Sequence, residues 1–250
     1  MVTVLILAAG YAKRLRSVMN ESYLPKGLVK VQGRPVLWYT TKKIENTDVA
    51  TVIIVTNKLS KPFYEKYIAE LNTSKNYILV TEEISDIDNP IGVGETVEQV
   101  IKMMNIRSNL LILPCDNIFT YDLQCLLDFY RSLKNGDVVG TYELSDINAL
   151  KQRAVVGINE SNKIIYYRNR PEQPLSNYIL LLHVLLGKKS LKSLSAFLKG
   201  QHEREYLRDF IGSRVPFGVH GFDIGREWID IGTPDELEGA NKLAWITKLL

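Results

Sequence analysis

The chain has 250 residues, of which 46% are hydrophobic and 24% charged, as expected for one globular α/β unit, alone or with a smaller lobe. Its net charge of +3, from 31 basic and 28 acidic residues, is too balanced to indicate nucleic-acid binding. No apolar run reaches the ~18 to 20 residues of a membrane span, and two cysteines without a C-x-x-C pair favour a reducing cytoplasm over a disulfide framework.

Segments with strand and helix patterns alternate along residues 1–142. Short apolar, β-rich runs typical of buried parallel strands lie at 3–7, 52–55, 78–80, 110–113 and 138–142. Apolar residues at helical spacing predict helices around 63–71, 97–104 and 123–130. This alternation predicts right-handed crossovers and a mostly parallel sheet covered by helices, with ligands at the carboxyl ends of its strands.

The pattern changes from about residue 154. A hairpin is expected over 154–159 and 163–167, then a long apolar strand over 178–186, helices near 191–199 and 205–211, and strands at 219–224 and 228–229. We interpret these elements as a small mixed-sheet lobe followed by a return to the main sheet. A final helix is predicted with Thr233 as N-cap, Pro234 at its first position and Glu236 completing a capping box.

The loop after the first strand has the features of a phosphate site. Ala8, Ala9 and Gly10 are small enough to let a ligand approach the backbone N–H groups, and Arg14 and Lys26 supply positive charge. A tight turn with solvated charges is the alternative interpretation. A dinucleotide site is disfavoured because G-x-G-x-x-G is absent.

Two aspartates are candidate metal ligands. Asp116, with Asn117, follows the apolar strand at 110–113, where a carboxylate could hold Mg²⁺ or simply cap the turn. Asp230 stands between two isoleucines ahead of the final helix, as a second metal anchor or as a hydrogen-bond acceptor of the loop.

Taken together and in order, these segments resemble the sugar-1-phosphate nucleotidylyltransferases, in particular their short, glucose-1-phosphate thymidylyltransferase-like form. The resemblance covers nearly the whole chain. It rests on P-K-x-L-x-x-x-x-G-x-P at 25–35, a G-D-N-like segment at 115–117, E-K-P-like and P-x-S-N segments at 169–171 and 174–177, and W-x-D-x-G-T-P at 228–234. The short form lacks an appended acyltransferase domain, and we expect none here.

The resemblance implies a Rossmann-like, glycosyltransferase-A-like sheet with an inserted sugar lobe, all in one domain over 1–250. Residues 1–150 would bind the nucleotide, 151–227 the sugar, and 228–250 would carry a metal motif and the C-terminal helix. It also implies transfer of a nucleotidyl group from an NTP to a sugar 1-phosphate or similar phosphate ester, in the cytoplasm and with Mg²⁺. No nucleic-acid or membrane partner is expected, and a homo-oligomer stays open.

The resemblance also assigns roles to residues. Asp116 and Asp230 would hold Mg²⁺, while Arg14 and Lys26 would be catalytic. The residues implied for nucleotide binding are Ala8, Ala9, Gly10, Arg14, Lys26, Gly92 and Gly94. Those implied for the sugar phosphate are Asn169, Arg170, Ser176 and Asn177.

The chain departs from the family pattern at several positions. Ala12 replaces a glycine of the phosphate loop, and Asn169 replaces a glutamate that binds sugar hydroxyls. Ala154 and Leu182 add side-chain volume where relatives have glycine. These changes predict an acceptor held differently from glucose 1-phosphate. They also leave an alternative open, a catalytically reduced relative that serves as a nucleotide-binding or nucleotide-sugar-binding regulatory subunit.

Overall fold

A computed structural model of the chain describes residues 1–18, 23–83, 91–200 and 206–250. It divides into two compact units that interleave along the sequence. Unit 1 comprises residues 1–2, 91–112 and 125–226, and unit 2 comprises residues 3–90, 113–124 and 227–250. The subdomain boundaries expected at 150 and 227 therefore remain a prediction. Among the described residues, no helix combines the length and the apolar character needed to cross a membrane.

Unit 2 contains the parallel strands expected from the apolar runs. β1 (Val2–Ala8), β4 (Thr51–Thr56) and β5 (Asn76–Thr81) pair in parallel in that order, and Ala8 lies opposite Thr56 where β1 and β4 end. Helices α1 (Val36–Glu45) and α2 (Lys61–Ala69) belong to the same unit. The helical spacing predicted α2 but not α1, whose polar Thr40 and Thr41 interrupt the apolar pattern although both are buried.

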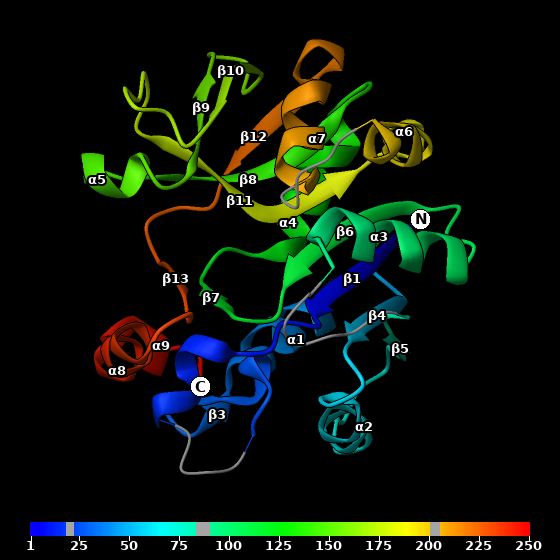
Figure 1. The fold of residues 1–250 in the computed structure, drawn as a ribbon, viewed down its shortest axis with the longest axis vertical. Helices are drawn as coiled ribbons and strands as arrows, with labels where there is room; N and C mark the ends of the chain where they lie inside the picture. The colour runs from blue at the N-terminus through cyan, green and yellow to red at the C-terminus, as the bar shows by residue number, and fades with distance from the viewer. Residues whose placement is uncertain (19–22, 84–90, 201–205) are drawn as a thin grey trace. The chain divides into compact units, whose positions relative to one another are not determined.

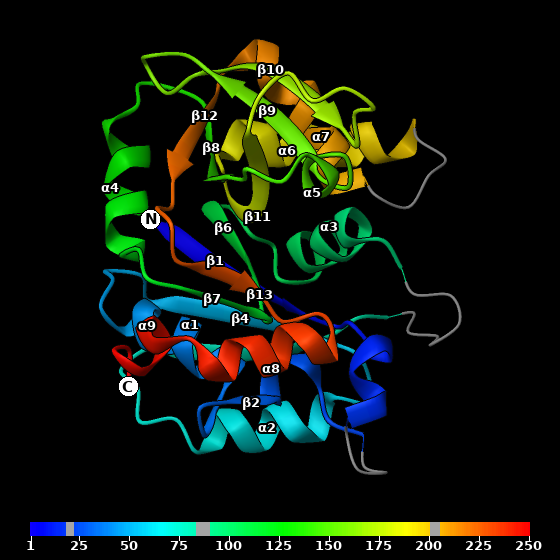
Figure 2. The same ribbon diagram turned by 90° about the vertical axis from the view of Figure 1, so that its left-hand side faces the viewer.

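A second layer of unit 2 holds the C-terminal elements together. β7 (Asn117–Phe119) pairs antiparallel with β13 (Trp228–Asp230), beside α8 (Pro234–Lys242), as Figure 2 shows. A short β2–β3 pair (Lys30–Val31 and Arg34–Pro35) and α9 (Ala244–Thr247) complete this part. Their shared core consists of Val31, Val36, Tyr39, Ile118, Ile231, Ala240 and Ile246.

The start of α8 differs from the expected capping box in one contact. Thr233 is the N-cap, and its side-chain oxygen accepts a hydrogen bond from the Glu236 N–H at 3.3 Å, as predicted. The Glu236 carboxylate accepts from the Gly232 N–H at 2.8 Å instead of from the N-cap N–H. The reciprocal half of the box was therefore wrong by one residue, and Glu236 ties the helix to the loop that follows Asp230.

Unit 1 is built on a mixed sheet (Figure 1). Its strands are β6 (Asn109–Pro114, which ends in unit 2), β8 (Asp137–Glu143), β9 (Ala154–Ile158), β10 (Ile164–Asn169), β11 (Tyr178–Leu186) and β12 (Val219–Asp223). β9 and β10 form the expected hairpin, and β12 runs parallel to β8. β11 pairs antiparallel with β6, β8 and β9, so the apolar run assigned to the lobe also joins strands of the first half of the chain.

The longer helices of unit 1 lie where the apolar spacing predicted helices, whereas the short helix α5 was not predicted. They are α3 (Val93–Met103), α4 (Leu123–Ser132, which begins in unit 2), α5 (Ile147–Leu150), α6 (Lys188–Lys199) and α7 (Tyr206–Arg214). Glu205, the expected first residue of the α7 segment, lies outside the described residues. The mixed α/β architecture is the class expected from the sequence.

Candidate active site

Three charged side chains predicted for the site meet in unit 2. The Lys26 ammonium forms an ion pair with the Asp116 carboxylate and lies 3.6 Å from Oδ1 of Asp230. The three side chains are only 16%, 17% and 27% exposed, respectively. Two carboxylates therefore converge on one cation in a partly shielded environment, where charge interactions are stronger than in bulk water.

Close packing of two turns brings Lys26 to Asp116. Lys26 begins the 3₁₀ turn η2 (Lys26–Leu28), and Asp116 lies in the turn between β6 and β7. A Cβ on Gly27 would lie 3.0 Å from Cβ of Cys115 and 3.1 Å from its carbonyl oxygen. The absence of a side chain at Gly27 thus allows the two turns to touch. The Cys115 N–H also donates to the Leu7 carbonyl at 3.2 Å, which fixes the Asp116 turn at the end of β1.

Strand alternation places Asp230 on the same face as this turn. Along β13 and beyond it, Ile229 and Ile231 pack into the core described above, so Asp230 between them points to the opposite face. In the β7–β13 pair Asp230 lies directly opposite Asn117. The sequence pattern W-I-D-I therefore delivers a carboxylate to the site and two side chains to the core.

Electrostatics keep Lys26 charged. Burial alone lowers the pKa of the Lys26 ammonium, but the carboxylates of Asp116 and Asp230 together outweigh that effect and raise the pKa above its usual value. The neighbouring Cys115 behaves oppositely, because burial and then the Asp116 carboxylate raise the pKa of its thiol to about 12. The Cys115 thiol is therefore protonated near neutral pH, and the residue packs against Gly27.

The remaining residues of the predicted phosphate loop also lie in unit 2. The carbonyl of Ala9 accepts from Asn57 Nδ2 at 2.7 Å, which holds the loop after β1. Gly10 is exposed, and a Cβ there would meet no atom within 4 Å. Ala12 has φ of 51°, a left-handed conformation that favours the glycine found here in the family pattern.

Arg14 lies beside the loop that follows Asp230. A Cβ on Gly232 would come within 3.0 Å of an Arg14 guanidinium nitrogen and 3.1 Å of Oε2 of Glu236. Arg14 itself is exposed on the 3₁₀ turn η1 (Lys13–Val18). The Arg14 guanidinium thus lies against the loop that follows Asp230. Lys26, by contrast, pairs directly with the carboxylates of Asp116 and Asp230.

The residues predicted for the base and the sugar phosphate lie in unit 1. Gly92 is the N-cap of α3, its N–H donates to Glu95 at 3.2 Å, and Gly94 is buried in the first turn. The sugar-phosphate set flanks β10 and β11 and consists of Asn169, Arg170, Ser176 and Asn177. Oδ1 of Asn169 is buried without a hydrogen-bond partner, and Arg170 has φ of 48° with its N–H bonded to the Arg153 carbonyl.

Two residues of the site had no assigned role in the sequence analysis. Nδ2 of Asn117 donates to Oδ1 of Asp116 at 3.0 Å and to Oδ1 of Asp230 at 3.4 Å. Trp228 Nε1 donates to Oδ1 of Asn117 at 2.8 Å. Both residues belong to the motifs at 115–117 and 228–234, and the alternation of W-I-D-I is the signal that places Trp228 on the face of Asp230.

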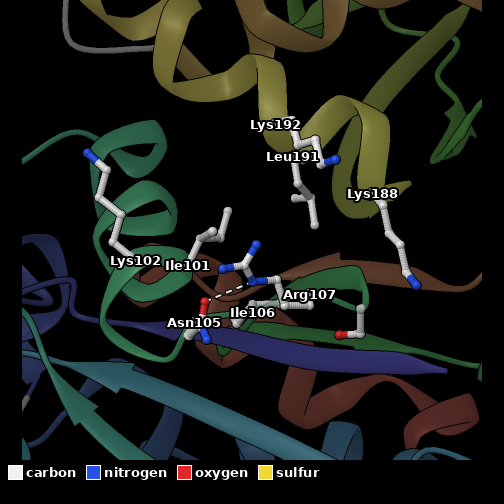
Figure 3. A pocket seen from close by; sticks show the side chains of 9 residues that line it. Ile101, Lys102, Asn105, Ile106, Arg107, Lys188, Leu191 and Lys192 are labelled. Carbon is white, nitrogen blue, oxygen red and sulfur yellow. Dashed lines mark hydrogen bonds between the residues drawn. The ribbon is translucent and has the colours of Figure 1, made fainter.

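A separate pocket in unit 1 is lined by none of the predicted site residues (Figure 3). It has a volume of about 410 Å³ and lies among Ile101, Lys102, Asn105, Ile106, Arg107, Ser108, Lys188, Leu191 and Lys192. Figure 3 shows Lys102 directed away from the other labelled side chains, and Arg107 is bonded to Asn105. The charged side chains therefore do not converge as those of Lys26, Asp116 and Asp230 do.

Comparisons with known proteins agree with the motifs. The family model described as nucleotidyl transferase matches residues 3–244. A relative named "Putative mannose-1-phosphate guanyltransferase", from Sulfolobus acidocaldarius, is 24% identical over 94% of this chain, which spans 60% of that relative's length. A D-glycero-α-D-manno-heptose 1-phosphate guanylyltransferase from Aneurinibacillus thermoaerophilus is 25% identical over 95% of this chain and 96% of its own.

The fold is also shared with solved structures. A UDP-glucose pyrophosphorylase solved with UDP-glucose superposes with a TM-score of 0.82 at 16% identity, covering 99% of both chains. The predicted α/β fold is therefore confirmed. Because the family model spans nearly all of the sequence, the chain belongs to the nucleotidyl transferase family.

Proposed function

We propose that this chain transfers the nucleotidyl group of an NTP to a sugar 1-phosphate, or a similar phosphate ester, and releases pyrophosphate. The observation that carries the proposal is the convergence of Lys26, Asp116 and Asp230 at the ends of β1 and β6. The names of the relatives, both of them guanylyltransferases acting on sugar 1-phosphates, support it. We also propose a cytoplasmic location, in keeping with the two free cysteines of the chain.

The proposed reaction is an in-line substitution at phosphorus. A phosphate oxygen of the acceptor forms a bond to the α-phosphorus, the bond from that phosphorus to the bridging oxygen breaks, and pyrophosphate leaves with the electron pair. The protein has to bring two anions together and neutralise them, so positioning and charge provide most of the catalysis. Lys26 would neutralise the transferring phosphate, and exposed Arg14 would bind the leaving pyrophosphate.

The donor atoms present fit a divalent cation. Asp116 and Asp230 turn oxygens toward the same ammonium and the same amide nitrogen, and carboxylate oxygens are the ligands Mg²⁺ prefers. No cluster of three or more His, Cys, Asp or Glu side chains is found in the described part of the chain. Mg²⁺ is usually bound through one or two carboxylates together with substrate phosphates. Bound there, Mg²⁺ would neutralise phosphate charge and orient the triphosphate.

The acceptor is proposed to differ from glucose 1-phosphate in how it is held. Asn169 offers a buried amide oxygen where the family pattern has a carboxylate, and that oxygen has no protein partner in the structure. Leu182 is half-buried on β11. A neutral acceptor atom and an added side chain would both weaken binding of a glucose ring, by roughly 1 to 3 kcal/mol for each lost hydrogen bond or clash.

The test is a measurement of pyrophosphate release over a grid of reactants. GTP, dTTP, UTP and CTP are each paired with mannose, glucose and heptose 1-phosphates in the presence of Mg²⁺. At least one pair should give turnover, with glucose 1-phosphate poor. No release from any pair, together with retained NTP binding, would overturn the proposal and favour the binding-only regulatory relative.

A matched pair of variants tests the site. Asp116→Asn should lower turnover by at least about 100-fold with little change in thermal stability, because electrostatic groups of this kind act on the ligand. Asp128→Asn, which removes an exposed carboxylate that pairs with Arg131 on α4, should leave turnover unchanged. Equal activities of the two variants would show that Asp116 is not part of the catalytic site.

A further inference from the structure

One buried side chain connects the two candidate metal carboxylates. Asn117, only 4% exposed, donates its Nδ2 to Oδ1 of Asp116 at 3.0 Å and to Oδ1 of Asp230 at 3.4 Å. Its Oδ1 accepts from Nε1 of Trp228 at 2.8 Å. The amide therefore uses both of its ends, with the positive end on two carboxylates and the negative end on an indole.

The Trp228 indole determines which way this amide points. An indole N–H is a donor only, so the Asn117 atom that faces it has to be the oxygen. The amino group is then directed at the carboxylates. With the reverse orientation, the amide oxygen would face two carboxylates and its amino group would face another N–H, so every contact would be repulsive.

The strand register makes this arrangement possible. Asn117 lies opposite Asp230 in the β7–β13 pair, and Trp228 lies two residues before Asp230 on the same face. Directly opposite and diagonal neighbours are the cross-strand positions whose side chains interact. Asp116 reaches the amide from the turn that precedes β7. One antiparallel pair thus assembles the donor, its support and one of the two carboxylates.

We propose that Asn117 is a positioning residue that holds Asp116 and Asp230 at a common point for a divalent cation, and that the Trp228 N–H orients it. The inference rests on the proposed function, because it concerns the preparation of the same site. Two carboxylates at close range repel each other, and Lys26 and Asn117 are the groups seen to bridge them. When Lys26 turns to the phosphates, Asn117 remains to hold the pair.

The test measures binding of Mn²⁺ alone to the purified, nucleotide-free chain by electron paramagnetic resonance. Asn117→Leu keeps a similar volume but loses the donor, and Trp228→Phe keeps an aromatic ring but loses the N–H. Removal of a group that orients metal ligands typically weakens metal affinity about 10- to 100-fold. We expect that range for Asn117→Leu and a smaller loss for Trp228→Phe. Trp245→Phe, at a partly buried tryptophan that packs against the core around Ile231 and Ile246, is the control and should bind as wild type.

A double variant separates positioning from general structural support. If Trp228 acts through Asn117, adding Trp228→Phe to Asn117→Leu should cause no further loss of Mn²⁺ affinity. Losses that multiply would overturn the orienting role of Trp228, and wild-type affinity of Asn117→Leu would overturn the proposal. Thermal unfolding without metal is measured in parallel. If Asn117→Leu does not fold, the folded Trp228→Phe variant tests the proposal by itself. Weaker Mn²⁺ binding by that variant would support the proposal, and wild-type binding would overturn it.

The Mn²⁺ measurement and the pyrophosphate assay can fail separately, so failure of the positioning role is distinguishable from failure of the proposed function. A wild-type chain that releases no pyrophosphate, but whose Mn²⁺ affinity falls in Asn117→Leu, would remove the proposed function and leave the positioning role intact. If the wild-type chain is active but neither Asn117→Leu nor Trp228→Phe changes its Mn²⁺ affinity, the proposed function stands and the positioning role of Asn117 is overturned.

Discussion

Replacing Lys26 by methionine should tighten metal binding while it impairs turnover. The Lys26 ammonium lies between the carboxylates of Asp116 and Asp230, where the proposed cation would bind. In the nucleotide-free chain the two cations compete for the same oxygens. Methionine keeps an unbranched side chain of similar length without charge, so Lys26→Met removes the competitor and leaves the space filled.

The size of this effect follows from the geometry. Two unit charges at the 3.6 Å separation of Lys26 and Asp230 interact by about 5 kcal/mol at an effective dielectric constant of about 20. The side chains are 16% to 27% exposed, so desolvation and screening remove much of that energy. A remaining competition of about 1.4 to 2.8 kcal/mol corresponds to Mn²⁺ binding about 10- to 100-fold tighter. Without metal, the unpaired carboxylates should lower the free energy of unfolding by about 1 to 3 kcal/mol.

Titration with Mn²⁺, followed by electron paramagnetic resonance and by thermal unfolding, measures both quantities. The Tm of Lys26→Met should be lower without metal and should rise more on Mn²⁺ addition than the wild-type Tm does. Lys102→Met is the control, because that lysine pairs with Glu98 at 2.7 Å on the surface of α3. Mn²⁺ affinity that is unchanged or weaker in Lys26→Met would refute the competition and the shared position of the two cations.

Three further predictions concern the loops and the core. Gly27→Ala should lower the free energy of unfolding by about 1 to 3 kcal/mol and reduce turnover, because its Cβ would meet Cys115 at 3.0 Å. Gly10→Ala is the control and should fold normally, because a Cβ there meets no atom within 4 Å. Equal Tm values for the two variants would contradict the prediction. Ala12→Gly should leave the free energy of unfolding unchanged or raise it by up to about 1 kcal/mol, since φ of 51° strains alanine. A calorimetric scan that shows a clear decrease in Tm would argue against the strain. Burial lowers the pKa of His183 to about 3. Below its unfolded pKa of about 6.5 the unfolded chain binds a proton that the folded chain does not, so stability should fall by about 1.4 kcal/mol per pH unit until the pH nears the folded pKa of about 3. His183→Gln should flatten that slope.

Much of this fold follows from local residue order. The apolar runs at 52–55 and 178–186 are β-branched or long enough to form buried strands in any compact context, and β4 and β11 contain them. The two carboxylates could be found for a similar reason. Asp116 follows an apolar strand and Asp230 alternates with two core isoleucines, so both carboxylates were expected outside the core at strand ends.

Helix α1 shows where local order is insufficient. Thr40 and Thr41 are polar by composition, yet both are buried, and the Thr41 hydroxyl is hydrogen-bonded to that of Tyr67, from α2. A hydroxyl that finds its partner on another helix can be buried at little cost. The partner is not visible in the spacing of a single segment, so the apolar pattern alone did not predict this helix.

The sequence by itself thus determined the longer strands, most helices, the family and the charged residues of the candidate site, but not the short strands β2, β3 and β7. Tertiary structure decided which of these residues touch and what supports them. Nothing local shows that Gly27 packs against Cys115 or that Trp228 orients Asn117, since these contacts join segments about 90 and 111 residues apart. The distance between such segments is set by strand register and core packing, which are properties of the whole fold and not of any one stretch of chain.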